Sequence, residues 1–285
     1  MADIRAFDAP QDENLLEFSR LLWQQRIPHR LVESGDRQVL WVGQVAHVAQ
    51  ATDLYRRWQR GETPALQRAR PAPPASPDRW LLAVLRAPVT ALLLLLSVAG
   101  FLLVELDPGM HWVKLFTFFE FERIGDHWVF VLPQGEYWRM FTPVFLHFSL
   151  LHITFNMLWW WDLGRRIEVA QGSVHLGGIV LSIGMGSNIV QFMFSGASVF
   201  GGMSGVIYGL LGYCWIWSRM TGDQRMAVPG PVMAIMLGWL LLCMAGFAAL
   251  LGAGAVANAA HVGGLMMGLL LGGAAALFAR SAKPR

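Results

Sequence analysis

Residues 201–208 read Gly-Gly-Met-Ser-Gly-Val-Ile-Tyr and open an apolar segment that continues to Trp217. Glycine and serine are the ordinary small residues of helix–helix contacts in a bilayer, so packing is the first interpretation of Ser204. The stretch is not the Gly-x-Ser-x-Gly turn of soluble hydrolases, because Val206 occupies the position of the last glycine. Taken alone, it favours a packing role for Ser204 over a catalytic one.

A second stretch, residues 258–268, changes that balance because it contains a histidine. His261 precedes Gly264 and Gly268 within an apolar run. A histidine inside a membrane span is costly to bury and by default indicates function. We therefore interpret the rest of the chain as a scaffold that brings Ser204 to His261.

The composition predicts a polytopic membrane protein. Of the 285 residues, 55% are hydrophobic and 14% are charged, and the mean hydropathy is +0.44, which is too apolar for a soluble protein of this length. Cys214 and Cys243 lie in apolar runs and lack the spacing of a disulfide framework or a metal site. The first apolar run begins near Pro88 after a charged segment, so we expect no signal peptide and a cytoplasmic N-terminus.

Residues 1–62 are predicted to form a small cytoplasmic α+β domain. Short strand patterns alternate with two helix patterns in the order β-α-β-β-α. Within this domain, His29 and His47 are expected to be lone residues without catalytic partners. The predicted elements are residues 4–7, 13–25, 29–32, 38–42 and 45–60.

Residues 63–86 follow as a proline-rich linker, and residues 87–280 are predicted to form a bundle of six transmembrane helices before a tail at 281–285. The fourth span is short for a hydrocarbon core of about 30 Å, which needs about 20 residues. Its start is therefore expected to lie below the membrane surface, where the loop 195–202 reaches it. The six predicted spans are residues 88–106, 143–163, 174–194, 203–217, 232–251 and 258–278.

Positively charged residues orient this bundle. With both termini in the cytoplasm, the short loops carry seven Lys and Arg residues inside and three outside, in keeping with the positive-inside rule. The second, fourth and sixth spans then all start at the outer face. This arrangement places Ser204, His261, His152 and Asn156 at a similar outer depth, with His152 and Asn156 on one helix face. The aromatic-rich loop 107–142 is expected to lie at or in the outer interface.

Glycines in the fourth and sixth spans provide the means of close approach. Small residues four apart let two helix backbones come together, which would bring Ser204 within about 2.6–3.2 Å of His261. The same glycines would pack a transporter or a channel equally well, so they support the geometry without proving chemistry. They are Gly205, Gly209 and Gly212 in the fourth span and Gly264, Gly268 and Gly272 in the sixth.

These residues predict a Ser–His dyad for peptide hydrolysis. Ser204 would attack the peptide carbonyl, and His261 would take its proton and later give it to the leaving amine. No Asp or Glu lies in the outer halves of the second, fourth and sixth spans, and Glu105 is expected to be an interfacial charge. A third triad member is therefore not predicted. Tyr208, one helical turn after Ser204, would orient the base.

The oxyanion that develops in such a reaction needs hydrogen-bond donors. The candidates are His152, Asn156 and the backbone N–H groups of Ser204 and its neighbours, and one donor is typically worth on the order of 10²–10³ in rate. An interhelical polar clamp is an equal alternative for Asn156. The sequence contains no metal motif, phosphate loop or dinucleotide fingerprint, so we expect no cofactor, nucleotide or nucleic acid.

Five short pieces between about residues 138 and 279 carry a family resemblance. They are Trp138-Arg139, His152-x-x-x-Asn156, Glu168-x-x-x-Gly172, Gly202-Met203-Ser204-Gly205 and Ala260-His261-x-x-Gly264-x-x-x-Gly268. Together they resemble the rhomboid family of intramembrane serine proteases. The N-terminal domain and the linker are similar, by pattern alone, to the cytoplasmic domain of bacterial GlpG-type rhomboids.

This resemblance implies a six-helix rhomboid bundle in the bacterial inner membrane. The implied activity is the cleavage of transmembrane helices of other proteins through an acyl-enzyme, at a water-accessible site near the outer face, without cofactor or ATP. It also implies a substrate gate at the fifth span, although residues 250–257 lack the bulky aromatic side chains expected there. The implied roles are Ser204 as nucleophile, His261 as base, His152, Asn156 and Gly202 as the oxyanion site, and Tyr208 stacked on His261.

Two other functions compete with the endopeptidase. A non-catalytic rhomboid-like membrane protein could grip client helices with the same bundle, but a pure binder has no need of the Ser204–His261 pair. A small transporter is the third alternative. It is disfavoured because the sequence has no visible inverted repeat and no charged residues at mid-membrane.

Overall fold

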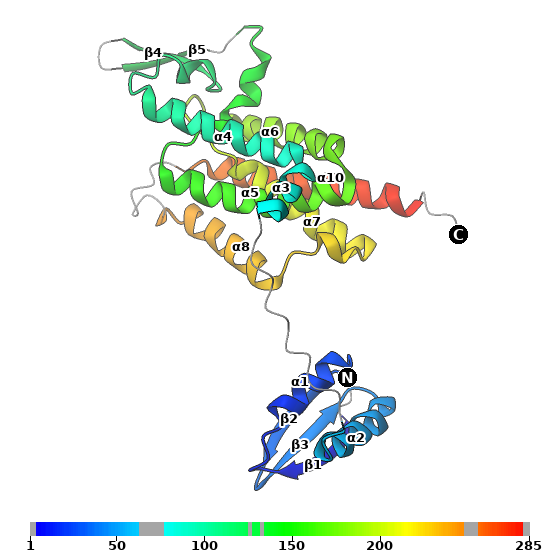
Figure 1. Cartoon of the computed structure of the whole chain (residues 1–285). Helices are drawn as coiled ribbons and strands as arrows, with labels where there is room; N and C mark the ends of the chain where they lie inside the picture. Colours follow the sequence, from blue (N-terminus) through cyan, green and yellow to red (C-terminus); the bar gives the residue numbers. More distant parts are fainter. Residues whose placement is uncertain (1–3, 63–76, 125–126, 132–133, 248–255, 282–285) are drawn as a thin grey trace. The chain divides into compact units, whose positions relative to one another are not determined.

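The computed structural model of this protein describes residues 4–62, 77–124, 127–131, 134–247 and 256–281. The chain divides into two units, Met1–Ser76 and Pro77–Arg285 (Figure 1). Most of the predicted linker, 63–86, lies outside the described residues. Its last part is helix α3 (Pro77–Leu85), which begins the second unit. A proline suits the first position of a helix, which explains why the linker ends earlier than the sequence predicts.

The N-terminal unit has the predicted order of elements. Its antiparallel sheet has the strand order β1-β3-β2, and Phe18 of α1 packs with Leu40 of β3 in its core. His29 is not a lone residue, so that prediction is wrong: its Nδ1 donates to the Ile27 carbonyl at 2.9 Å, and its Nε2 lies 2.7 Å from Ser19 Oγ. The elements are β1 (Ile4–Pro10), α1 (Leu16–Gln24), β2 (His29–Ser34), β3 (Arg37–Val42) and α2 (Val45–Gln59).

Long helices make up most of the second unit. Among the described residues, α4, α6 and α10 are long and apolar enough to cross a membrane, and α8 is a shorter apolar helix. The predicted helical membrane fold is therefore confirmed, while the count of six spans stays a prediction. The main helices are α4 (Pro88–Leu106), α5 (Leu150–Gln171), α6 (Ser173–Ser195), α7 (Ser204–Thr221), α8 (Gly230–Met244) and α10 (Asn258–Ser281).

Helix α5 lies further along the chain than the predicted second span, 143–163. Residues before it form a short 3₁₀ turn, η3 (Thr142–Phe145), and α5 begins only after Ser149, whose side chain accepts the N–H of His152 at 3.2 Å. At the other end, an ion pair between Arg166 and Asp162 at 2.9 Å lets the helix continue past its charged residues. Apolar periodicity detects neither the cap nor the ion pair.

Helix α7 lies at the centre of the bundle, and every residue from 205 to 214 is buried. A helix that is buried all round is enclosed by its neighbours. Its contact with α10 depends on glycine: a Cβ atom on Gly264 would overlap the carbonyl oxygen of Gly205, and one on Gly268 would overlap that of Gly209. The predicted close approach of the fourth and sixth helices is confirmed.

The predicted fifth span, 232–251, is only partly described. Helix α8 ends at Met244, and residues 248–255 lie outside the described part of the chain. Most of the stretch that the family resemblance relates to a gate, 250–257, falls there as well. The side of α8 that faces the bundle buries Met236, Leu240 and Cys243.

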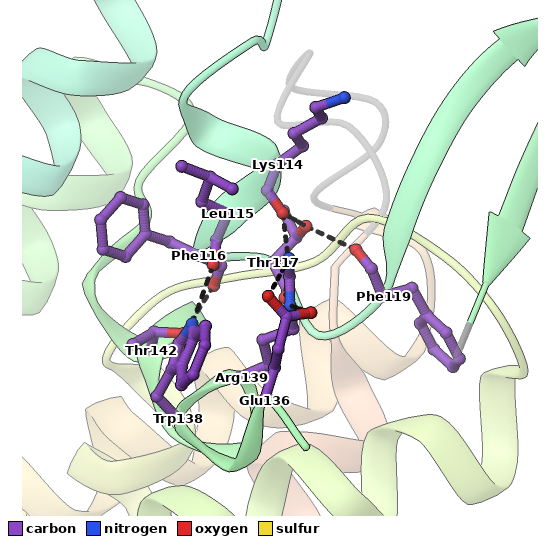
Figure 2. Close-up of polar contacts among 9 residues, drawn as sticks. All are labelled: Lys114, Leu115, Phe116, Thr117, Phe119, Glu136, Trp138, Arg139 and Thr142. Carbon is purple, nitrogen blue, oxygen red and sulfur yellow. Dashed lines mark hydrogen bonds and ion pairs between the residues drawn. The ribbon is translucent and has the colours of Figure 1, made fainter. Parts of the chain in front are cut away.

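The loop between α4 and α5 is folded around one buried arginine. Arg139 is 2% exposed and binds Glu136, with its Nε 2.9 Å from Glu136 Oε2. Figure 2 shows it donating to the carbonyls of Lys114 and Thr117, so it joins two parts of the loop. The hairpin in this loop was not predicted from the sequence. The elements are η1 (Val113–Leu115), β4 (Glu120–Ile124), β5 (His127–Val131) and η2 (Tyr137–Met140).

Candidate active site

Ser204 and His261 meet where α7 and α10 begin. Ser204 is the first residue of α7, and its Oγ lies 2.7 Å from Nε2 of His261, a hydrogen-bond distance. His261 is 5% exposed. The glycine contacts between the two helices allow this approach, because a larger residue at Gly264 or Gly268 would push the backbones apart. The short serine side chain can then reach the imidazole directly.

No third member extends this pair within the described residues. The Nδ1 atom of His261 is buried and has no hydrogen-bond partner there. Among the described residues, the arrangement is thus a serine and a histidine without a carboxylate hydrogen-bonded to the ring. Other contacts must hold the orientation of the imidazole.

Two residues position the ring of His261. The Tyr208 ring centroid lies 5.0 Å from that of His261, with the planes at 43°. The two rings are therefore in contact, as the resemblance implies, but they are tilted. The Tyr208 hydroxyl donates to the Met236 carbonyl of α8 at 2.9 Å, which holds the ring from its other end. The backbone N–H of Ala260, beside His261, donates to Gln191 Oε1 of α6 at 3.0 Å.

Of the predicted oxyanion residues, Gly202 and His152 lie together near Ser204, whereas Asn156 forms a hydrogen bond within α5. Gly202 has φ +115°, and a Cβ placed on it would lie 2.6 Å from His152 Nε2 and 3.8 Å from Ser204 Oγ, so the His152 ring lies against the backbone that leads into α7. Asn156 is 6% exposed, and its Nδ2 donates to the His152 carbonyl at 2.8 Å within α5. That hydrogen bond is neither an oxyanion contact nor the interhelical clamp considered as an alternative.

His147 lies beside this loop and was not singled out from the sequence. It is fully buried; its Nδ1 donates to the Phe145 carbonyl at 3.0 Å, so its Nε2 can accept the N–H of Met203 at 3.4 Å. Its ring also contacts that of His152, with centroids 4.9 Å apart. His147 therefore links the residue before Ser204 to the candidate oxyanion histidine. The available signal was a polar residue inside a predicted membrane span.

Glu168 was quoted in the family pattern without a role, and the structure gives it one. It is 3% exposed and accepts hydrogen bonds from the N–H groups of Val89 and Thr90, both at 2.8 Å, and from the hydroxyl of Ser173 at 2.7 Å. A carboxylate at a helix N-terminus accepts hydrogen bonds from the free N–H groups and interacts favourably with the positive end of the helix dipole. Glu168 thus fastens the start of α4 to the end of α5, far along α5 from His152.

Comparison with known proteins identifies the family. A model of the rhomboid domain matches residues 134–277, and a model of the rhomboid N-terminal domain matches residues 1–69. The chain belongs to the rhomboid family. The first match contains Ser204, His261 and the candidate residues around them.

Curated relatives bear the name rhomboid protease GlpG. The protein from Serratia proteamaculans is 45% identical over 136 residues, 48% of this chain and 47% of that protein. The one from Yersinia pestis is 43% identical over 136 residues, with the same shares. The one from Pectobacterium atrosepticum is 38% identical over 184 residues, 65% of this chain and 61% of that protein. The aligned stretches therefore span about half to three fifths of these relatives.

Proposed function

We propose that this chain is an intramembrane serine endopeptidase that cleaves transmembrane segments of other membrane proteins. The observation that carries the proposal is the 2.7 Å contact between Ser204 Oγ and His261 Nε2. The relatives support it as well, because they belong to the same family as this chain and are named as proteases. No cofactor enters the proposed reaction.

In the first half of the reaction, Ser204 Oγ attacks the scissile carbonyl carbon while its proton passes to Nε2 of His261. The carbonyl oxygen becomes an oxyanion. Ser204 opens α7, so its N–H group is among those without a partner inside the helix, and the positive end of the helix dipole stabilises the negative charge. The His152 ring, which lies against Gly202 beside Ser204 Oγ, is placed to donate a further hydrogen bond.

In the second half, the tetrahedral intermediate collapses. The C–N bond breaks, the leaving amine takes the proton from Nε2, and an acyl-enzyme ester remains on Ser204. Water then attacks the ester and gives its proton to His261, and a second collapse releases the carboxylic acid and returns the proton to Ser204. Tyr208 and the Gln191 contact to Ala260 hold the imidazole in place through both halves, the role that a carboxylate has in a triad.

The proposed setting is a bacterial inner membrane, which the chain crosses six times with both termini in the cytoplasm. Three of the helices in the described part of the chain have the length and apolarity of a span, and the Lys and Arg distribution supports the orientation. With this orientation Ser204 and His261 lie toward the outer side, where water can reach them. The proposed substrates are single helices that enter from the bilayer.

The proposal is tested by labelling the detergent-solubilised full-length protein with a fluorescent fluorophosphonate, which reacts with activated serines. Wild-type protein is expected to label and Ser204→Ala is not. Ser198→Ala, a serine change in the loop before α7, is the matched control and should label as wild type does. A folded wild-type protein that does not label would favour the client-binding alternative, which needs no activated serine.

A further inference from the structure

A cavity of about 420 Å³ lies at the end of α7 opposite Ser204. Arg219 is 15 residues after Ser204, which at 1.5 Å per residue places it about 22 Å along the helix. Trp215 and Arg219 of α7 form one wall, and Gly230, Met233 and Ala234 of α8 form another. The cavity thus lies where the chain turns from α7 into α8 (Figure 1, yellow to orange). We refer to it as the α7–α8 cavity.

The cation in this cavity has no ion-pair partner among the described residues. The Arg219 guanidinium is exposed and lies 6.0 Å from the centroid of the Trp215 ring. By contrast, neighbouring Arg225 is paired with Asp223 at 2.7 Å. A cation–π contact does not use the N–H donors of the guanidinium, so these remain available for hydrogen bonds. Arg219 can therefore bind an anion that enters the cavity.

The start of α8 adds a second attraction for negative charge. Gly230 is the first residue of this 15-residue helix, and it lines the cavity. No side chain caps the helix, and its first turn contains no acidic residue. The N–H group of Gly230, which has no partner inside the helix, and the positive end of the helix dipole therefore face the same space as the guanidinium, whereas the next residue, Pro231, has no N–H group to offer. Proteins bind phosphate groups with this combination.

A path for acyl chains leads away from the cavity along α8. Ala234 lines the cavity, and four and seven residues later the same helix face presents Gly238 and Leu241. A Cβ on Gly238 would meet no atom within 4 Å, and Leu241 is 66% exposed. Trp215 is also partly exposed at the cavity, and tryptophan favours the headgroup level of a bilayer. A soluble phosphate ester would leave this apolar face uncovered.

We propose that the α7–α8 cavity binds the phosphate group of an anionic phospholipid, with its acyl chains along the Gly238–Leu241 face of α8. Arg219 and the N-terminus of α8 hold the phosphate. The bound lipid therefore ties the start of α8 to the end of α7. This inference requires the chain to lie in a membrane and is independent of the proposed peptidase activity.

The test measures lipid binding to the full-length protein in detergent by native mass spectrometry. Phosphatidylglycerol and phosphatidylcholine with the same acyl chains are titrated separately, and wild type is expected to retain phosphatidylglycerol in preference. Arg219→Gln is expected to weaken that binding about five- to tenfold, since one arginine at a membrane surface is worth about 1 kcal/mol and contacts inside a cavity add to it. Arg225→Gln removes the same charge outside the cavity and should change binding less than twofold.

A second variant separates the cavity from general charge. Ala234→Phe fills the cavity without altering any charge and is expected to weaken phosphatidylglycerol binding to a similar extent, with helicity by circular dichroism as the check on folding. Equal losses in Arg225→Gln and Arg219→Gln would overturn the proposal, as would full binding by folded Ala234→Phe. Displacement of the lipid by an equal concentration of glycerol phosphate would assign the site to a soluble phosphate and overturn the lipid assignment.

Discussion

At the scale of single residues, the proposed chemistry depends on how firmly the backbone before Ser204 is held. The Gly202 N–H donates to the Pro143 carbonyl at 3.0 Å, and the Met203 N–H donates to the buried His147 ring. Both contacts come from the segment just before α5. They fix the first turn of α7, where the oxyanion would form, before any substrate arrives. Such preorganisation is what makes donors effective in a transition state.

Replacing His147 tests this support. His147→Phe keeps a ring of similar size but leaves the Met203 N–H without its acceptor, and an unsatisfied buried donor costs about 1–3 kcal/mol. We expect a lower melting temperature and slower fluorophosphonate labelling of Ser204. His127→Phe changes an exposed histidine of β5 and should alter neither. Unchanged labelling and stability in His147→Phe would show that the ring does not support the loop.

At the scale of helices, the distance between α7 and α10 controls whether the dyad can form. Gly268→Ala places a methyl group into the carbonyl oxygen of Gly209, and overpacking of this kind costs about 1–3 kcal/mol. We expect lower stability and loss of labelling, because the helices must separate. Gly273→Ala, on the same helix, meets no atom within 4 Å. It should label normally and be as stable as wild type or more so, measured by thermal unfolding.

The α4–α5 contact can be tested in the same way. Glu168→Gln removes the negative charge at the start of α4 and leaves a buried amide among N–H donors. Loss of a charged hydrogen-bonding group of this kind is worth about 1.5–3 kcal/mol, so we expect a clear fall in the melting temperature. Glu105→Gln changes an exposed carboxylate at the other end of α4; it is the control and should have little effect. Equal effects of the two substitutions would contradict the specific role of Glu168.

At the scale of the whole molecule, the stability of the protein should depend on pH through Asp107, which begins the loop between α4 and α5. Burial opposes ionisation of Asp107, but the N–H groups of Val113 and Trp112 outweigh it and lower the pKa of the carboxyl. A lowered folded-state pKa means that the carboxylate stabilises the loop above its unfolded pKa of about 3.9 and that this contribution is lost as the pH falls through the folded pKa. The melting temperature of Asp107→Asn should therefore lie below that of wild type near neutral pH, and the gap should narrow below about pH 4. A gap independent of pH would contradict this assignment.

The sequence predicted the parts of the molecule that follow from composition and spacing. The apolar runs indicated the helical membrane unit, and the regular glycines placed Ser204 beside His261. Contacts between distant segments were not predictable in this way. The start of α5 depends on the Ser149 cap, the tilt of Tyr208 depends on a carbonyl of α8, and His147 acquires its partner only when the loop before α7 packs on it. The first is a local hydrogen bond and the other two are tertiary hydrogen bonds, and none of them produces a hydrophobic period in the sequence.

The most direct test of the central claim is cleavage of a single-span membrane protein in liposomes that contain the purified full-length chain. Wild type and Ser198→Ala are expected to cut the substrate within or beside its membrane segment. Ser204→Ala and His261→Ala, inserted to the same level, are expected to leave it intact. Cleavage by Ser204→Ala at the wild-type rate would contradict the account, because no other residue in it forms the acyl-enzyme.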